Sequence, residues 1–129
     1  DGNNRSTAVD RLVRRGVAYR REQANPDDAL WMIDRAEALA RQDAQTYAKW
    51  RFGIQAERCS TLRQAGDRPG AEMALGDLDM LAAKSHDPYE RAKAAYERAR
   101  FYEHHDPATA EGLLVEAKSL LAEVSPAAR

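Results

Sequence analysis

A turn followed by a small residue and, four positions later, a large apolar residue occurs three times in this chain. The second and third copies are offset by 39 residues, and the first and second by 42. The copies comprise Asn25, Ala29 and Ile33; Asp67, Ala71 and Leu75; and Asp106, Ala110 and Leu114. Repeats of this length are typical of helix pairs stacked into an α-solenoid, because each pair needs a neighbour to bury its apolar face. The small residue lets the two helices of a pair approach closely where they cross.

Between the turns, apolar residues recur three and four positions apart, which is the period of a helix, and no segment shows the sustained alternation of a strand. The pattern predicts six helices, at residues 6–23, 27–42, 44–65, 69–84, 88–104 and 107–124. A proline stands at or just before four of the predicted starts, where its missing N–H costs nothing. The residues preceding these prolines include four N-cap candidates, Asn25, Asp67, Asp87 and Asp106.

Length and composition exclude several classes of protein. With 129 residues the chain is expected to form one domain, and its 20 basic and 21 acidic residues nearly cancel, so we expect no nucleic-acid partner. No run of 18 apolar residues exists, so we expect no membrane insertion. The compartment stays open. Because the chain begins at Asp1 and the last apolar stripe runs to Val124, we expect it to be a piece of a longer protein.

The segment "HHDPATAE", residues 104–111, looks like the start of a metal site. It occupies the same place in its repeat as "AGDRPGAE", residues 65–72, so we interpret it as a turn. Adjacent residues at a helix end point about 100° apart, so His104 and His105 are poorly placed to chelate one ion. Cys59, the single cysteine, lies mid-helix without a recognisable base and excludes an intrachain disulfide. We therefore expect no catalytic residue, no metal and no cofactor.

The segments "QAGDRPGAEMALGDLDML", "HHDPATAEGLLVEAKSLL" and "ANPDDALWMIDRAEALA" resemble the tetratricopeptide repeat, whose second helix follows a glycine-aspartate turn and opens with a small residue. In the best match Gly66, Asp67 and Ala71 stand at the family positions, whereas Leu78 stands where the family has a small residue. The repeats cover about residues 8–42, 44–84 and 88–124. They depart from the family period of about 34 residues, and the Leu-Gly pair of the first helix is largely missing. The resemblance implies an all-α, right-handed solenoid of three antiparallel helix pairs, similar to divergent repeats of bacterial signalling proteins.

In such solenoids the first helix of each pair lines a concave groove, and the resemblance places Arg11, Arg14, Arg21, Arg63 and Tyr102 there. Residues 1–24 carry six arginines against three acidic residues, and arginine forks suit carboxylates. We therefore expect a non-catalytic module that binds a protein or peptide segment, of acidic character, as a regulatory or sensory part of a bacterial signalling protein. A merely solvated face is the alternative for these arginines.

Two further sets of residues are candidates for contacts with partners. Tyr47 and Trp50 pack in the core or, alternatively, anchor a partner, because large rigid aromatic side chains often do so. Leu121 and Val124 continue the apolar stripe of the last helix, where no capping helix follows. A two-fold contact burying them is the simplest closed form. The alternative function is accordingly a homodimerisation or scaffolding domain with no ligand in the groove.

Overall fold

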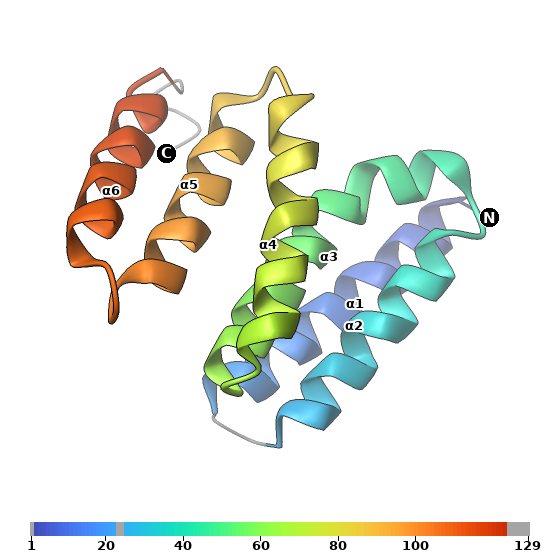
Figure 1. The fold of residues 1–129 in the computed structure, drawn as a ribbon. Helices are drawn as coiled ribbons and strands as arrows, with labels where there is room; N and C mark the ends of the chain where they lie inside the picture. Colours follow the sequence, from blue (N-terminus) through green and yellow to red (C-terminus); the bar gives the residue numbers. More distant parts are fainter. Residues whose placement is uncertain (1, 23–24, 124–129) are drawn as a thin grey trace.

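A computed structural model describes residues 2–22 and 25–123, and these residues form six helices (Figure 1). The helices are α1 (Gly2–Arg21), α2 (Pro26–Ala40), α3 (Ala44–Gln64), α4 (Arg68–Ala83), α5 (Pro88–Tyr102) and α6 (Pro107–Leu121). Within the described part of the chain helix is the sole regular structure, so the all-α prediction is confirmed. Helices α2 to α6 begin within one residue of the predicted starts. Only α1 begins clearly earlier, at Gly2 instead of residue 6.

Helices α2 to α6 each begin after an Asn or Asp whose side chain accepts a hydrogen bond from a backbone N–H of the first turn. The caps are Asn25, Asp43, Asp67, Asp87 and Asp106. These bonds satisfy N–H groups that a helix start leaves without an intrahelical partner. Four of the caps are predicted from the prolines beside them, and Asp43 lacks that signal because no proline follows it.

The helices pack chiefly as sequential pairs, α1 with α2, α3 with α4 and α5 with α6. Successive pairs are joined by contacts of α2 with α3 and of α4 with α5, and α3 also contacts α1 and α5. In the described ranges α2, α4 and α6 do not pack against one another. Helix α3 is therefore the central element of the molecule. The end of α1 and the turns from α3 to α4 and from α5 to α6 lie at the same, lower end in Figure 1.

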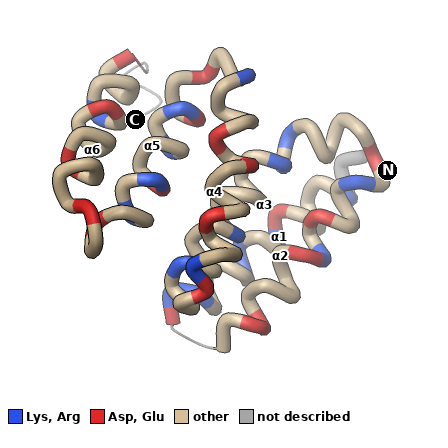
Figure 2. Tube along the Cα trace, in the orientation of Figure 1, with Lys and Arg blue, Asp and Glu red and all other residues tan. Residues whose placement is uncertain are grey.

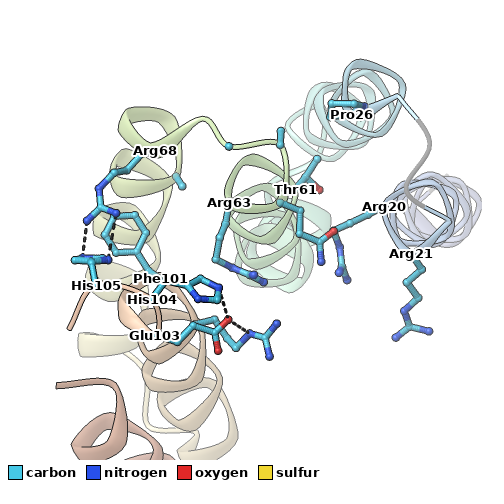
Figure 3. A pocket seen from close by; sticks show the side chains of 15 residues that line it. Arg20, Arg21, Pro26, Thr61, Arg63, Arg68, Phe101, Glu103, His104 and His105 are labelled. Atoms are coloured by element: carbon cyan, nitrogen blue, oxygen red, sulfur yellow. Dashed lines mark hydrogen bonds and ion pairs between the residues drawn. The ribbon is translucent and has the colours of Figure 1, made fainter. Parts of the chain in front are cut away.

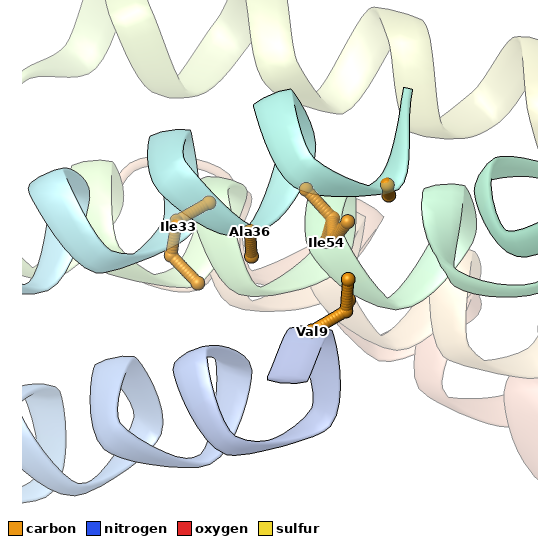
Figure 4. Close-up of a cluster of buried hydrophobic side chains, with 5 residues drawn as sticks. Val9, Ile33, Ala36 and Ile54 are labelled. Carbon is orange, nitrogen blue, oxygen red and sulfur yellow. The ribbon is translucent and has the colours of Figure 1, made fainter. Parts of the chain in front are cut away.

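Three apolar clusters hold the helices together, and the smallest of them joins Cys59 of α3 with Ala74 and Leu75 of α4. The first joins Val9 of α1, Ile33 and Ala36 of α2 and Ile54 of α3, all nearly or fully buried (Figure 4). The second joins α3, α4 and α5 around Leu78, which is fully buried. Its size is accommodated by the small side chains of Ala56 and Ala94 in the same cluster. A leucine can therefore stand where the tetratricopeptide pattern has a small residue.

Helices α1 and α2 approach closely at Gly16, which is buried against Ile33. A Cβ atom at position 16 would lie 2.9 Å from Cδ1 of Ile33 and 3.5 Å from the carbonyl oxygen of Ala29. Ala29 is fully buried, as its role at a helix crossing requires. The crossing of the first pair thus combines a glycine on α1 with an alanine on α2.

Gly16→Ala and Gly76→Ala form a matched test of this crossing, because both replace an interior helical glycine. A Cβ at Gly76 has no other atom within 4 Å, so this substitution should raise the free energy of unfolding by about 0.5–1 kcal/mol. At Gly16 the added methyl meets Ile33, so the free energy of unfolding of Gly16→Ala should be at least about 1 kcal/mol lower than that of Gly76→Ala. Urea denaturation measures both variants. Equal stabilisation would contradict the close approach of α1 and α2.

Candidate binding site

An open cleft of about 1060 Å³ lies where the C-terminal ends of α1, α3 and α5 meet the turns that precede α4 and α6. Its lining contains one acidic residue, Glu103, and five arginines: Arg20, Arg21, Arg63, Arg68 and Arg100. Figure 2 shows charged residues gathered near the α3–α4 turn. In Figure 3 Arg20 and Arg21 lie on one side of the cleft, Arg68 and His105 lie on the other, and Arg63 lies between them. The cleft is thus strongly basic, although the whole chain is nearly neutral.

One of these arginines is paired with a carboxylate buried beside the cleft. Glu57 of α3 is 8% exposed and accepts two hydrogen bonds from the Arg20 guanidinium. Arg20 Nε donates to Oε2, and Arg20 Nη2 donates to Oε1 at 3.1 Å. This hydrogen bonding to Glu57 raises the pKa of Arg20 above its ordinary value, against the opposing effect of burial. The Arg20 charge is therefore used by the fold, since a buried carboxylate needs a cation.

A second carboxylate, Glu97 of α5, is 1% exposed. Its Oε1 accepts a hydrogen bond from Ser60 Oγ at 2.9 Å and lies 3.2 Å from Lys93 Nζ. Its Oε2 is 4.0 Å from Arg63 Nη2, the outer limit of an ion pair. Among the described residues neither Glu97 Oε2 nor Arg63 Nε has a hydrogen-bond partner. Arg63 is thus attracted by Glu97 but keeps donors that Glu97 does not use.

The remaining arginines of the cleft differ in their partners. Arg100 Nε lies 3.5 Å from Glu103 Oε1. Neither Arg21 nor Arg68 forms an ion pair with a carboxylate in the ranges that the structure describes. Both side chains are exposed. Two positive charges, one on each side of the cleft, are therefore not neutralised by a carboxylate of the described residues.

Arg68 is held by rings instead of by a carboxylate. Its guanidinium carbon lies 4.7 Å from the centre of the Phe101 ring, a cation–π contact. Its Nη1 and Nη2 lie 3.2 Å and 2.6 Å from Nδ1 and Nε2 of His105. The His105 ring in turn packs against Phe101 and Tyr102, with centroids 6.0 and 5.2 Å away. These contacts connect the α3–α4 turn with the α5–α6 turn.

The structure brings together only part of the groove set expected from the sequence. Arg21 and Arg63 line the cleft, whereas Tyr102 does not line it and packs against the ring of His105, which does. Arg11 and Arg14 lie elsewhere on α1: both are exposed, and Arg14 pairs with Asp10 at 3.0 Å. The basic surface is thus centred on the ends of three helices and does not follow the length of α1.

The aromatic candidates Tyr47 and Trp50 are not among the residues that line the cleft. Tyr47 and Trp50 are half-buried against the first apolar cluster. Trp50 Nε1 donates a hydrogen bond to Ser6 Oγ at 2.9 Å, and the Arg41 guanidinium covers the Tyr47 ring at 4.6 Å. Both side chains thus help to fix α3 against its neighbours.

The self-association candidates lie on α6 and beyond it. Leu121 is 38% exposed at the end of the helix, and Val124 falls outside the described residues.

The residues weighed for metal binding and nucleophilic chemistry have structural surroundings. His104 and His105 lie in the turn after α5, as the repeat predicts. His104 is 3.6 Å from Glu103, whereas His105 faces Arg68. The described residues hold no cluster of three His, Cys, Asp or Glu side chains placed for a metal ion. Burial raises the pKa of the Cys59 thiol to about 12, so this thiol is protonated at neutral pH.

Arg68, Phe101 and His105 were not expected from the sequence to act together. The repeat nevertheless contains a signal for them, because His105 stands at the repeat position of Gly66. Turns at equivalent repeat positions come to the same end of stacked helix pairs, so residues of the two turns become neighbours. Glu57 and Glu97 carry no such signal, since nothing in their local pattern separates them from exposed glutamates.

The chain matches no protein-family model, and no curated protein or solved structure is significantly similar to it. Across the described residues, none of the helices combines the length and the apolar character that crossing a membrane requires.

Proposed function

We propose that this chain is a non-catalytic module that binds an acidic segment of a partner protein in the arginine-rich cleft. The observation that carries the proposal is the pair of arginines Arg21 and Arg68, which lie on opposite sides of that cleft and have no carboxylate partner among the described residues. Carboxylate side chains of an extended segment match arginine forks in charge and geometry. The wider setting, a regulatory or sensory part of a bacterial signalling protein, rests on the resemblance of the repeats to the tetratricopeptide pattern.

The same proposal includes the arrangement of the helices as a right-handed, tetratricopeptide-like solenoid of three antiparallel pairs. The contacts of α3 with both α1 and α5 support it, as does the lack of packing among α2, α4 and α6 in the described ranges. In such an arrangement the first helices of the pairs form one side, and their ends meet in the cleft. A ligand there would bridge all three repeats.

The test is a binding titration with a fluorescein-labelled peptide of alternating glutamate and serine residues, followed by fluorescence anisotropy. Arg21→Gln and Arg68→Gln should each weaken binding by roughly fivefold, because each removes an unpaired cation from the cleft. Arg11→Gln is the matched control on the exposed face of α1 and should bind like the parent. Added salt should weaken parent binding, since exposed charges are screened.

A peptide with glutamine in place of glutamate controls for charge and should not bind. The proposal fails if the acidic peptide does not bind the parent. It fails equally if Arg11→Gln weakens binding as much as Arg21→Gln and Arg68→Gln do.

A second candidate function, self-association through α6, is favoured by the exposure of its apolar residues. Leu75 and Ala82 of α4 are 2% and 6% exposed, whereas the residues 39 positions later, Leu114 and Leu121, are each 38% exposed. Helix α4 packs against both α3 and α5, but in the described part of the chain α6 packs against α5 alone. A second copy packed against α6 would cover the face of α6 that is equivalent to the face of α4 covered by α5.

Sedimentation equilibrium over a range of concentrations tests this alternative. Self-association predicts an apparent mass that rises with concentration in the parent and stays at the monomer value in Leu121→Lys. Met73→Lys on the exposed face of α4 is the control, since Met73 is 75% exposed, and it should behave as the parent. A parent that stays monomeric at every concentration removes the scaffold hypothesis.

A further inference from the structure

The contact between Arg68 and His105 requires that the imidazole be neutral. Two guanidinium nitrogens lie 3.2 and 2.6 Å from the two ring nitrogens, and a guanidinium has only donors. A neutral ring offers one acceptor nitrogen, whereas a protonated ring offers none and carries a positive charge. At these distances the protonated ring and the guanidinium would repel each other. Protonation of His105 therefore breaks the contact seen in the structure.

The groups around His105 do not compensate such a repulsion fully. Asp106, the nearest carboxylate along the chain, caps α6 by accepting hydrogen bonds from the Thr109 N–H and hydroxyl. These bonds, and to a smaller extent the charge of a protonated His105, lower the pKa of Asp106, so this one anion offsets part of the repulsion. Glu103 lies within reach of Arg100 and of His104, at 3.5 and 3.6 Å. The remaining charged groups that line this cleft with His105, from α1, α3 and α5, are Arg20, Arg21, Arg63 and Arg100. They add positive charge, so a released Arg68 turns towards an anion if one is present.

We propose that Arg68 receives the anionic group of the ligand, and that neutral His105 holds Arg68 back until protonation of His105 releases it. The inference rests on the proposed function and adds regulation by pH to the same site. Release frees both Nη groups of Arg68 for a bidentate contact, and the new charge on His105 adds to the attraction. Both effects act in one direction, so acidification tightens binding. Carboxylate ligands stay largely ionised in the range where histidine titrates.

The chain contains three histidines, and their different positions allow the role of His105 to be tested separately. His105 contacts Arg68, His104 lines the same cleft without that contact, and His86 lies in the turn between α4 and α5, away from the cleft lining. Removing each in turn separates release of Arg68 from a general increase in charge. A pH dependence of binding that one of these substitutions removes is thereby assigned to that imidazole.

The experiment measures anisotropy of the labelled glutamate–serine peptide at about pH 8 and about pH 5.5, at constant ionic strength. Parent affinity should rise by about fivefold on acidification, at the lower end of usual couplings between sites. His105→Gln should abolish this rise. His104→Gln removes an equal charge from the cleft and should keep most of the rise in affinity. Arg68→Gln should bind the peptide weakly at both pH values. Circular dichroism verifies that each variant is folded at both pH values.

Several outcomes overturn the inference while the proposed function stands. One is parent affinity that is the same at both pH values, and another is a rise that His104→Gln abolishes but His105→Gln keeps. If the peptide binds the parent at neither pH, the proposed function fails and the release is tested without ligand. In that case the Arg68 Nε–H resonance should move with pH in the parent and not in His105→Gln. A resonance unchanged in the parent would overturn the release itself.

Discussion

The burial of two glutamate side chains between α1, α3 and α5 is the constraint on which the rest of this structure depends. Glu57 and Glu97 are 8% and 1% exposed, and a charge taken out of water needs a cation beside it. Arg20 supplies the cation for Glu57, and Lys93 and Arg63 do so for Glu97. Basic residues must therefore converge from three helices on the place where the pairs meet. Two of the five cleft arginines, Arg20 and Arg63, are thus placed by the way the pairs are joined.

This origin explains why the arginines of the cleft are not equivalent. Arg20 is committed to Glu57, so its removal would leave a buried carboxylate unpaired and act on stability before it acts on binding. Arg21 and Arg68 pair with no buried carboxylate among the described residues, so their charges can contact a ligand. Arg63 stands between the two groups, at 4.0 Å from Glu97. Neighbouring arginines of the cleft thus differ in role: Arg20 stabilises the fold, whereas Arg21 and Arg68 can bind a ligand.

Most of the fold followed from local sequence signals, whereas the site followed only in part. Proline together with aspartate, or with asparagine in the case of α2, marks the starts of α2 and of α4 to α6, because capping acts over a few residues. The tetratricopeptide resemblance places Arg11, Arg14, Arg21 and Arg63 in one groove, and of these only Arg21 and Arg63 line the cleft. The contact of Arg68 with His105 joins residues 37 positions apart, one at the start of α4 and the other in the turn after α5. Such a contact depends on how the turns stack, which no local pattern specifies.

Mapping the acidic peptide on the folded protein with ¹H–¹⁵N NMR shows directly whether an acidic segment binds in the cleft. Binding in the cleft should change the backbone amide shifts at residues 20–21, 63–68 and 100–105, the segments that line it. Changes centred on Arg51 and Lys84, at a second and smaller basic depression, would contradict it. So would changes centred on the exposed face of α6 around Val115.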